Sequence, residues 1–181
     1  MSDFWVFGYG SLMWRPGFEF REARPALLSG AHRSLCIYSW VHRGTQARPG
    51  LVLGLDRGGS CRGIAYRVAG AKRESVMAYL RARELVTAVY LEAWRPIRVA
   101  GKKAPVSAVT YVVDRRHEQY AGHLPCRRLL ALVEKSIGGS GSNADYILAT
   151  VGHMRGIGIR DATLEWLADE LGGERQRSNG A

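Results

Sequence analysis

The sequence is short of the features that mark several protein classes. Its 181 residues include only three cysteines, Cys36, Cys61 and Cys126, an odd number without C-x-x-C spacing. Neither a disulfide framework nor a zinc ribbon is indicated, and we expect the three thiols to fill the core. The five histidines show no H-E-x-x-H or facial-triad spacing, so we expect no metal centre.

Long apolar runs are also missing. Apolar stretches such as residues 35–41 and 51–55 are far shorter than the roughly 20 residues needed to cross a hydrocarbon core. The first residues lack the basic and apolar regions of a secretory signal. We therefore expect a cytoplasmic protein without a membrane partner.

No long run of like charge occurs, although the chain carries 26 basic and 16 acidic residues and a net charge of +10. Residues 31–120 hold 16 Lys and Arg against 6 Asp and Glu, which accounts for the whole excess. Such a balance is compatible with nucleic acid, an anionic surface or an anionic small substrate. Because the basic residues are scattered singly or in pairs, we favour a solvated basic surface and expect no nucleic-acid partner.

Length and composition indicate one ordinary globular domain. Hydrophobic residues make up 46% of the chain and charged residues 23%, so a collagen-like or wholly disordered chain is excluded. Residues 172–181 are rich in Gly, Arg, Ser and Asn and lack an apolar anchor. We predict a single domain over residues 1–171 and a disordered tail over residues 172–181.

Strand-like segments dominate the first two thirds of the chain and helical ones the last third. The predicted strands cover residues 5–7, 34–41, 51–55, 61–68, 93–99 and 105–113. A helix over residues 73–85 is predicted from Val76, Met77 and Leu80 at helical spacing. This order, without regular β-α-β alternation, favours an α+β domain whose sheet curls into a small barrel.

Three further helices have readable starts. Pro125 suits a first helical position, Ser142 or Asn143 can cap the next helix, and Asp161 can cap the last. The segment between the first two, residues 136–143, is rich in Gly and Ser. It is compatible both with an anion-binding loop at a helix start and with a mobile linker.

The first candidate for chemistry is the loop Gly8, Tyr9, Gly10, Ser11 and Leu12, which follows a short buried strand. Glycine on both sides of Tyr9 permits positive φ angles, so that successive amides can point into one concavity. Such a cradle of N–H donors can hold a carboxylate or a developing oxyanion. A plain turn at a strand end explains the same residues equally well.

The second candidate is Glu84. In a helix it lies seven positions after Met77 and four after Leu80, so its carboxylate points into the apolar stripe. Burial raises a carboxyl pKa and can make it a proton acceptor near neutral pH. A structural glutamate paired with Arg81 or Arg83 is the other interpretation. No nucleophile elbow, Walker loop or dinucleotide fingerprint appears.

Five segments, in order along the chain, together resemble the ChaC family. They are residues 4–14 (FWVFGYGSLMW), 42–45 (HRGT), 49–50 (PG), 79–84 (YLRARE) and 141–146 (GSNADY). The resemblance implies a γ-glutamylcyclotransferase-like fold, a small mixed β-barrel with surrounding helices. It also implies a reaction without a cofactor, in which the α-amine of glutathione attacks its own γ-carbonyl and releases 5-oxoproline and cysteinylglycine.

The resemblance also implies site residues. Glu84 is expected to be the general base, and Gly8, Tyr9, Gly10, Ser11, Leu12 and Met13 to hold the γ-glutamyl group. Arg43 and Tyr146 lie in matching segments and would contact a substrate carboxylate or line the pocket, although a structural hydrogen bond also explains Arg43. The family often has glycine before the next tyrosine, where this chain has Val89 before Tyr90, so the role of Tyr90 stays open.

Two other functions stay open. The same loop and base suit a cyclotransferase for γ-glutamyl amino acids or γ-glutamylamines, because specificity resides in the leaving-group pocket. A non-catalytic module that binds nucleic acid or another anion through the basic surface is the alternative from a different class. The sequence does not give the oligomeric state.

Overall fold

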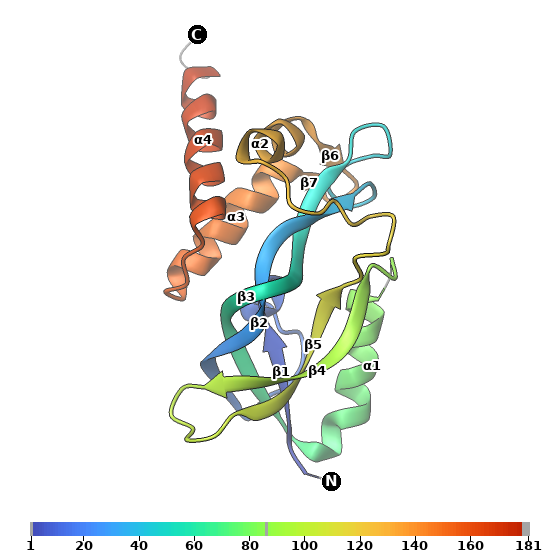
Figure 1. Cartoon of the computed structure of the whole chain (residues 1–181), viewed down its shortest axis with the longest axis vertical. Helices are drawn as coiled ribbons and strands as arrows, with labels where there is room; N and C mark the ends of the chain where they lie inside the picture. Colours follow the sequence, from blue (N-terminus) through green and yellow to red (C-terminus); the bar gives the residue numbers. More distant parts are fainter. Residues whose placement is uncertain (1, 86, 179–181) are drawn as a thin grey trace. The chain divides into compact units, whose positions relative to one another are not determined.

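The computed structural model describes residues 2–85 and 87–178 (Figure 1). The chain divides into two compact units. The barrel unit comprises Met1–Ser34 and Gly54–Tyr120, and the helical unit comprises Leu35–Leu53 and Ala121–Ala181. The single domain over residues 1–171 stays a prediction.

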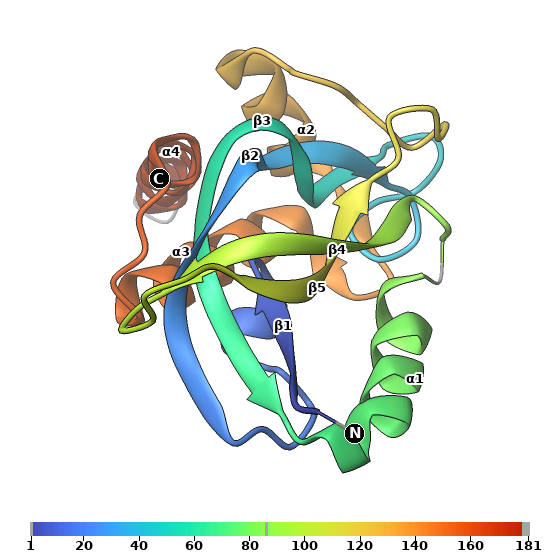
Figure 2. The ribbon, with the colours of Figure 1, turned by 60° about the horizontal axis from the view of Figure 1, so that its bottom comes forward.

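Five strands form a closed barrel in the order β1-β3-β2-β4-β5 (Figure 2). They are β1 (Phe4–Gly8), β2 (Glu22–Ser39), β3 (Gly50–Val68), β4 (Tyr90–Val99) and β5 (Val106–Val113). Strand β1 pairs antiparallel with β3 and parallel with β5, and β4 pairs antiparallel with β2 and β5. The predicted mixed barrel of an α+β fold is confirmed.

Strands β2 and β3 are longer than the sequence predicted. Residues 51–55 and 61–68 belong to one strand, and β2 begins at Glu22 rather than near residue 34. The glycines Gly58 and Gly59, which read as a break between strands, have φ values of 98° and 67° within β3. Glycine adopts these angles without a Cβ clash, so the strand can bend there and continue.

Helix α1 (Arg73–Glu84) packs against one face of the barrel strands. Successive strand residues point to opposite faces, so Val6 and its partners Tyr66 and Val109 share the face that α1 covers. Leu80 of α1 is fully buried in this cluster. A fully buried leucine stabilises the fold by about 1.5–3 kcal/mol relative to an exposed one. This packing fixes the helix that carries Glu84.

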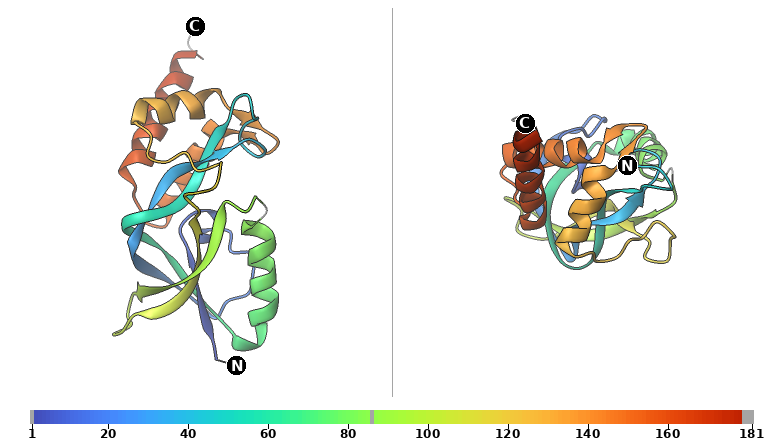
Figure 3. Two further views of the ribbon diagram at one scale, coloured as in Figure 1. Left: turned by 45° about the vertical axis from the view of Figure 1, so that its right-hand side comes forward. Right: turned by 90° about the horizontal axis from the view of Figure 1, so that it is seen from above.

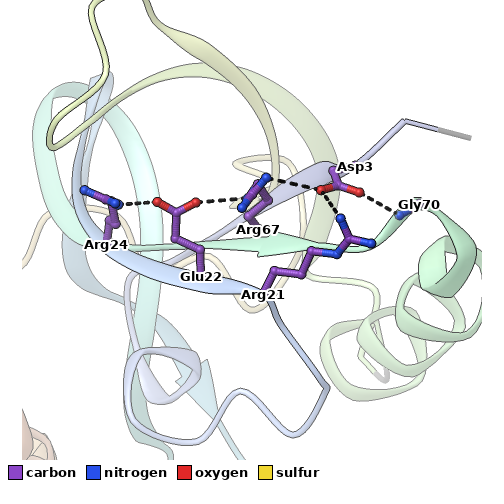
Figure 4. A network of polar contacts seen from close by, with 6 residues as sticks. All are labelled: Asp3, Arg21, Glu22, Arg24, Arg67 and Gly70. Carbon is purple, nitrogen blue, oxygen red and sulfur yellow. Dashed lines mark hydrogen bonds and ion pairs between the residues drawn. The ribbon is translucent and has the colours of Figure 1, made fainter.

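A network of ion pairs on the barrel unit links β1, β2 and β3 (Figure 4). The Asp3 carboxylate accepts a hydrogen bond from the Gly70 amide at 3.2 Å, just before α1, and pairs with Arg21 at 3.1 Å and Arg67 at 3.4 Å. Arg67 also pairs with Glu22 at 2.9 Å, and Glu22 pairs with Arg24. Exposed ion pairs contribute little singly, and the Asp3–Gly70 hydrogen bond ties the start of β1 to the short turn that precedes α1.

The helical unit contains α2 (Cys126–Lys135), a hairpin of β6 (Ile137–Gly138) and β7 (Gly141–Ser142), α3 (Asn143–Gly156) and α4 (Ala162–Ser178) (Figure 3). The three helices pack against one another. The predicted caps are confirmed: the Ser142 hydroxyl accepts from the Asp145 amide at 3.0 Å, and Asp161 accepts from the Leu164 amide at 3.2 Å. Pro125 is the N-cap of α2.

Three other expectations differ from the structure. Residues 137–142 form the β6–β7 hairpin, so the mobile-linker interpretation is wrong. Cys36 and Cys61 are buried as expected, whereas Cys126, the first residue of α2, is exposed. Helix α4 runs to Ser178, beyond the predicted tail boundary at residue 172, and residues 179–181 lie outside the described residues.

No helix in residues 2–85 and 87–178 has both the length and the apolar character of a membrane span.

Asp56 joins β3 to the segment after β5. Its buried carboxylate accepts hydrogen bonds from the Arg57 amide at 2.7 Å, the Arg115 guanidinium at 2.7 Å and the Tyr120 hydroxyl at 2.8 Å. Burial alone would raise the pKa of Asp56, but these hydrogen bonds together lower it below its ordinary value. The ionised carboxylate therefore stabilises the barrel unit.

We predict that Asp56→Asn lowers the free energy of unfolding by about 1.5–3 kcal/mol near pH 7, because charge-assisted hydrogen bonds are lost. A lowered folded-state pKa gives stability that is present above the unfolded value of about 3.8 and is lost as the pH falls through the folded value. Urea unfolding should show the two proteins converging below about pH 4. If Asp56→Asn lowered the free energy of unfolding as much below about pH 4 as near pH 7, the ionised Asp56 would not be a source of stability.

Candidate active site

The loop after β1 forms one tight helical turn. The Met13 amide donates to the Gly10 carbonyl at 2.9 Å, and the Arg15 amide donates to the Ser11 carbonyl at 2.9 Å. The expected positive φ angles are wrong here, since Gly10 has φ −127° and Gly8 is also outside the left-handed region. A Cβ on Gly8 would lie 3.0 Å from the Cβ of Leu12, so glycine is needed for the close approach of the turn.

Three consecutive amides of this loop are available to a ligand. Within the part of the chain that the structure describes, the N–H groups of Gly10, Ser11 and Leu12 have no hydrogen-bond acceptor. The first amides of a helical turn have no partner inside the turn. Ser11 is exposed, whereas Leu12 is buried in the cluster beneath α1. The loop therefore presents its N–H donors near the exposed Ser11, while the buried Leu12 holds the loop in place.

Glu84 is the last residue of α1, and its side chain is 18% exposed. Its carboxylate pairs with the neighbouring Arg83 at 3.1 Å. Burial raises the pKa of Glu84, and the adjacent Arg83 guanidinium only partly opposes this effect. Arg81, the other predicted partner, instead holds Glu92 through two hydrogen bonds of 2.7 and 3.0 Å.

Arg83 brings the two candidate features together. Its guanidinium donates to the Ser11 hydroxyl at 2.8 Å and to the Arg15 carbonyl at 2.7 Å, while Nε pairs with Glu84 at 3.1 Å. The Tyr79 hydroxyl lies 3.0 Å from the same guanidinium. The glycine loop and the Glu84 carboxylate are therefore held on the same side of the barrel unit by one side chain.

Tyr111 is a polar residue of this region that sequence reasoning missed. It lies on β5 opposite Glu92 of β4, is 1% exposed, and its hydroxyl has no hydrogen-bond partner among the described residues. Burial raises the pKa of Tyr111, and the negative charges of Glu92 and Glu84 raise it further. Nothing in the sequence separates Tyr111 from other strand aromatics, because its importance comes from its neighbours across the fold.

The connection from α1 to β4 shows how the chain departs from the family pattern. Ala88 has φ 55°, in the left-handed region that favours glycine. Val89 is buried, and its carbonyl accepts from the Asp114 amide at 2.8 Å. Tyr90 begins β4 and packs against the cluster that includes Tyr111. The backbone bends at Ala88, one residue before the position where the family often has glycine.

Arg43 and Tyr146 belong to the helical unit and contact each other there. The Arg43 guanidinium lies over the Tyr146 ring at 5.1 Å and donates to the Ser140 carbonyl at 2.5 Å. The Tyr146 hydroxyl accepts from the Leu53 amide at 3.3 Å. A Cβ on Gly50 would lie 2.3 Å from the Arg43 carbonyl oxygen. Close backbone packing therefore accounts for much of the residue pattern in this segment.

A shallow groove in the barrel unit lies apart from these features. Its volume is about 310 Å³, and neither Glu84 nor the glycine loop lines it. Its lining residues are Arg73, Glu74, Met77, Ala78, Arg81, Glu92 and Trp94. Within the described residues, no three His, Cys, Asp or Glu side chains gather as a metal site would require.

Comparison with known proteins identifies the class. A crystal structure of a γ-glutamylcyclotransferase specific to glutathione from yeast superposes with a TM-score of 0.81 at 21% identity, covering 96% of this chain and 100% of that one. This likeness establishes a γ-glutamylcyclotransferase-like fold.

Sequence relatives define the family. The model of the ChaC-like protein family matches residues 4–173. The glutathione-specific γ-glutamylcyclotransferase of Escherichia coli K12 is 34% identical over 157 residues, covering 87% of this chain and 68% of that protein. The human glutathione-specific γ-glutamylcyclotransferase 1 is 31% identical over 175 residues, covering 93% and 78% respectively. The chain belongs to the ChaC-like family.

The raised pKa of Glu84 predicts a pH-dependent effect of Glu84→Gln on stability. A carboxyl whose pKa is higher in the folded than in the unfolded state gives stability that is present below the unfolded value of about 4.5 and is lost as the pH rises through the folded value. Glu84→Gln should therefore become progressively more stable relative to the natural protein as the pH rises from about 4.5 through neutral pH. Urea unfolding across this interval measures the difference.

Glu74→Gln is the matched control, because Glu74 is an exposed carboxylate on the same helix. Because Glu74 is exposed, burial does not disfavour its charged form, and Glu74→Gln should lack the gain in relative stability expected for Glu84→Gln. If Glu84→Gln lacked this gain as well, Glu84 would not be a desolvated carboxyl.

Proposed function

We propose that the protein is a γ-glutamylcyclotransferase that cleaves glutathione to 5-oxoproline and cysteinylglycine. The observation that carries the proposal is the Arg83 bridge, which joins the Glu84 carboxylate to Ser11 of the glycine loop in a chain of the ChaC-like family. The names of the bacterial and human relatives support glutathione as the substrate.

The proposed reaction needs a base close to the substrate amine. The α-ammonium of glutathione is protonated near neutral pH and cannot attack until it loses a proton. We assign this proton transfer to Glu84, whose burial favours the protonated carboxyl and so makes it a better acceptor than an ordinary glutamate. The free amine then attacks the γ-carbon and gives up a second proton as the ring closes. The bond to the cysteine nitrogen breaks, and this nitrogen takes up both protons and leaves as the ammonium of cysteinylglycine.

The loop Gly8, Tyr9, Gly10, Ser11, Leu12 and Met13 is proposed to hold the γ-glutamyl group. Its free amides suit either of two negative groups: the α-carboxylate of the substrate or the oxyanion that develops as the amine adds. Fixed backbone donors need no reorganisation during the reaction, which makes them effective at either task. The Tyr111 hydroxyl is a further buried donor of this region, close enough to Glu84 and Glu92 for their charges to raise its pKa.

The proposed contact of Arg43 or Tyr146 with a substrate carboxylate, or their place in the pocket lining, stays a prediction, and the contacts with Ser140 and Leu53 give both residues a structural role. The reaction is an internal transfer, so it requires no redox or group-carrying cofactor. We place the enzyme in the cytoplasm. A second γ-glutamyl substrate class, the γ-glutamyl amino acids and amines, would use the same loop and base.

Release of 5-oxoproline tests the substrate assignment. We expect the purified protein to form 5-oxoproline from glutathione faster than from γ-glutamylalanine or a γ-glutamylamine at equal concentrations. Chromatographic measurement of 5-oxoproline and of the released dipeptide gives both products. If glutathione were the poorest substrate, the glutathione assignment would be wrong and the broader cyclotransferase activity would stand.

Substitution of the proposed base tests the mechanism. Glu84→Gln keeps the shape of the side chain but cannot accept a proton, so we expect turnover of glutathione to fall by about 10² to 10⁴. Glu74→Gln should keep nearly full turnover, because Glu74 is exposed on the same helix. Thermal unfolding of both variants establishes that they are folded. Most of the activity remaining in Glu84→Gln would exclude it as the base.

The non-catalytic alternative makes the opposite prediction in the same samples. A basic anion-binding module would show no turnover and would bind DNA or RNA with an affinity that falls steeply as salt is raised. Titration at two ionic strengths separates it from the enzyme.

A further inference from the structure

Two buried side chains reach the glycine loop from the barrel strands. Arg33 of β2 is 8% exposed and Tyr66 of β3 is 3% exposed. Both belong to the barrel unit, and neither occurs in the segments that carry the family resemblance. Each donates hydrogen bonds to backbone carbonyls of the loop, one near its start and one at its end.

Arg33 holds the start of the loop. Its Nε donates to the Tyr9 carbonyl at 2.6 Å, and its terminal nitrogen donates to the Arg62 carbonyl at 2.7 Å. The same terminal nitrogen lies 3.8 Å from the Met13 sulfur. The planar guanidinium presents its donors in a fixed fork. Arg33 therefore ties the loop to β3 with a defined geometry.

Tyr66 holds the end of the loop. Its hydroxyl lies 3.0 Å from the Leu12 carbonyl oxygen and 2.7 Å from the Met13 carbonyl oxygen, so one proton is shared between two acceptors. Burial raises the pKa of Tyr66 to about 12, which keeps the hydroxyl protonated as a donor.

Fixing these carbonyls also fixes the direction of the amides. All described peptide bonds are trans, so the N–H of Gly10 points opposite to the Tyr9 carbonyl that Arg33 holds. The Gly10 amide is therefore directed away from Arg33, and it has no acceptor within the described residues. The amides of Ser11 and Leu12 lie between the two anchored ends.

We propose that Arg33 and Tyr66 are positioning residues that clamp the glycine loop by its carbonyls and so keep the amides of Gly10, Ser11 and Leu12 aimed at the reacting γ-glutamyl group. The proposal rests on the proposed function. Donors that are fixed before the reaction stabilise developing charge most effectively, and misplacement by about 1 Å can reduce a rate by about 10²-fold. The clamp acts through the loop and touches no substrate atom itself.

The test compares Arg33→Lys and Tyr66→Phe with the natural protein in the glutathione assay. Lysine cannot bridge both carbonyls held by the guanidinium fork, and phenylalanine removes the shared proton while keeping the ring. We expect kcat to fall by about 10- to 100-fold in each variant, with a smaller change in KM. The acid limb of the pH profile should not move, because Glu84 is unchanged.

Thr110→Val is the matched control. Thr110 is 1% exposed, and its hydroxyl donates to the carbonyl of Phe7 in β1 at 3.1 Å, outside the loop. Valine removes one buried hydrogen bond from the same barrel. The melting temperature of Thr110→Val should therefore fall about as much as that of Tyr66→Phe, while kcat is retained. If Arg33→Lys fails to fold, Tyr66→Phe decides the comparison.

The results distinguish failure of the clamp from failure of the proposed function. Equal kcat in Tyr66→Phe and Thr110→Val, with an active natural protein, would overturn the clamp and leave the proposed function intact. A folded natural protein without 5-oxoproline release from any γ-glutamyl substrate would overturn the proposed function, and with it the catalytic role of the clamp.

Discussion

The guanidinium of Arg83 is the contact on which the candidate site depends. It joins an exposed loop tip at Ser11, the backbone at Arg15 and the carboxylate of Glu84, which lie at separate points of the chain. Glu84 ends a helix, where the backbone carbonyls carry partial negative charge and a carboxylate is disfavoured. Arg83 offsets part of this repulsion without removing the effect of burial. The Glu84 carboxylate is thereby ion-paired, and yet burial still disfavours its charged form.

The same physical chemistry gives Asp56 and Glu84 opposite characters in one barrel unit. Asp56 receives hydrogen bonds from a guanidinium, a hydroxyl and a backbone amide, so its charged form is favoured despite burial. Glu84 pairs with the neighbouring Arg83, and here the effect of burial prevails and raises its pKa. The number of donors around a buried carboxylate therefore decides whether its charged form or its protonated form is favoured.

The sequence predicted the barrel, the helix that carries Glu84 and the caps of the last two helices, because apolar spacing and capping residues act locally. It divided β3 in two, since a Gly-Gly pair reads as a turn and only the neighbouring strands show that pairing continues through Gly58. Sequence also named the glycine loop, but for the wrong backbone reason: Gly8 serves close packing against Leu12. Sequence patterns could not identify Arg33, Tyr66 and Tyr111, because the roles of these residues come from contacts across the barrel.

Ala88 carries a further meaning for the segment that follows the proposed base. A residue with a Cβ adopts φ 55° at a cost that glycine avoids, and the buried Val89 with its hydrogen bond to Asp114 supplies the compensation. A glycine at such a bend allows many backbone angles, whereas alanine followed by a buried valine allows fewer. The backbone at this bend is therefore more restricted than it would be with glycine, and this restriction fixes the direction in which Tyr90 enters the sheet.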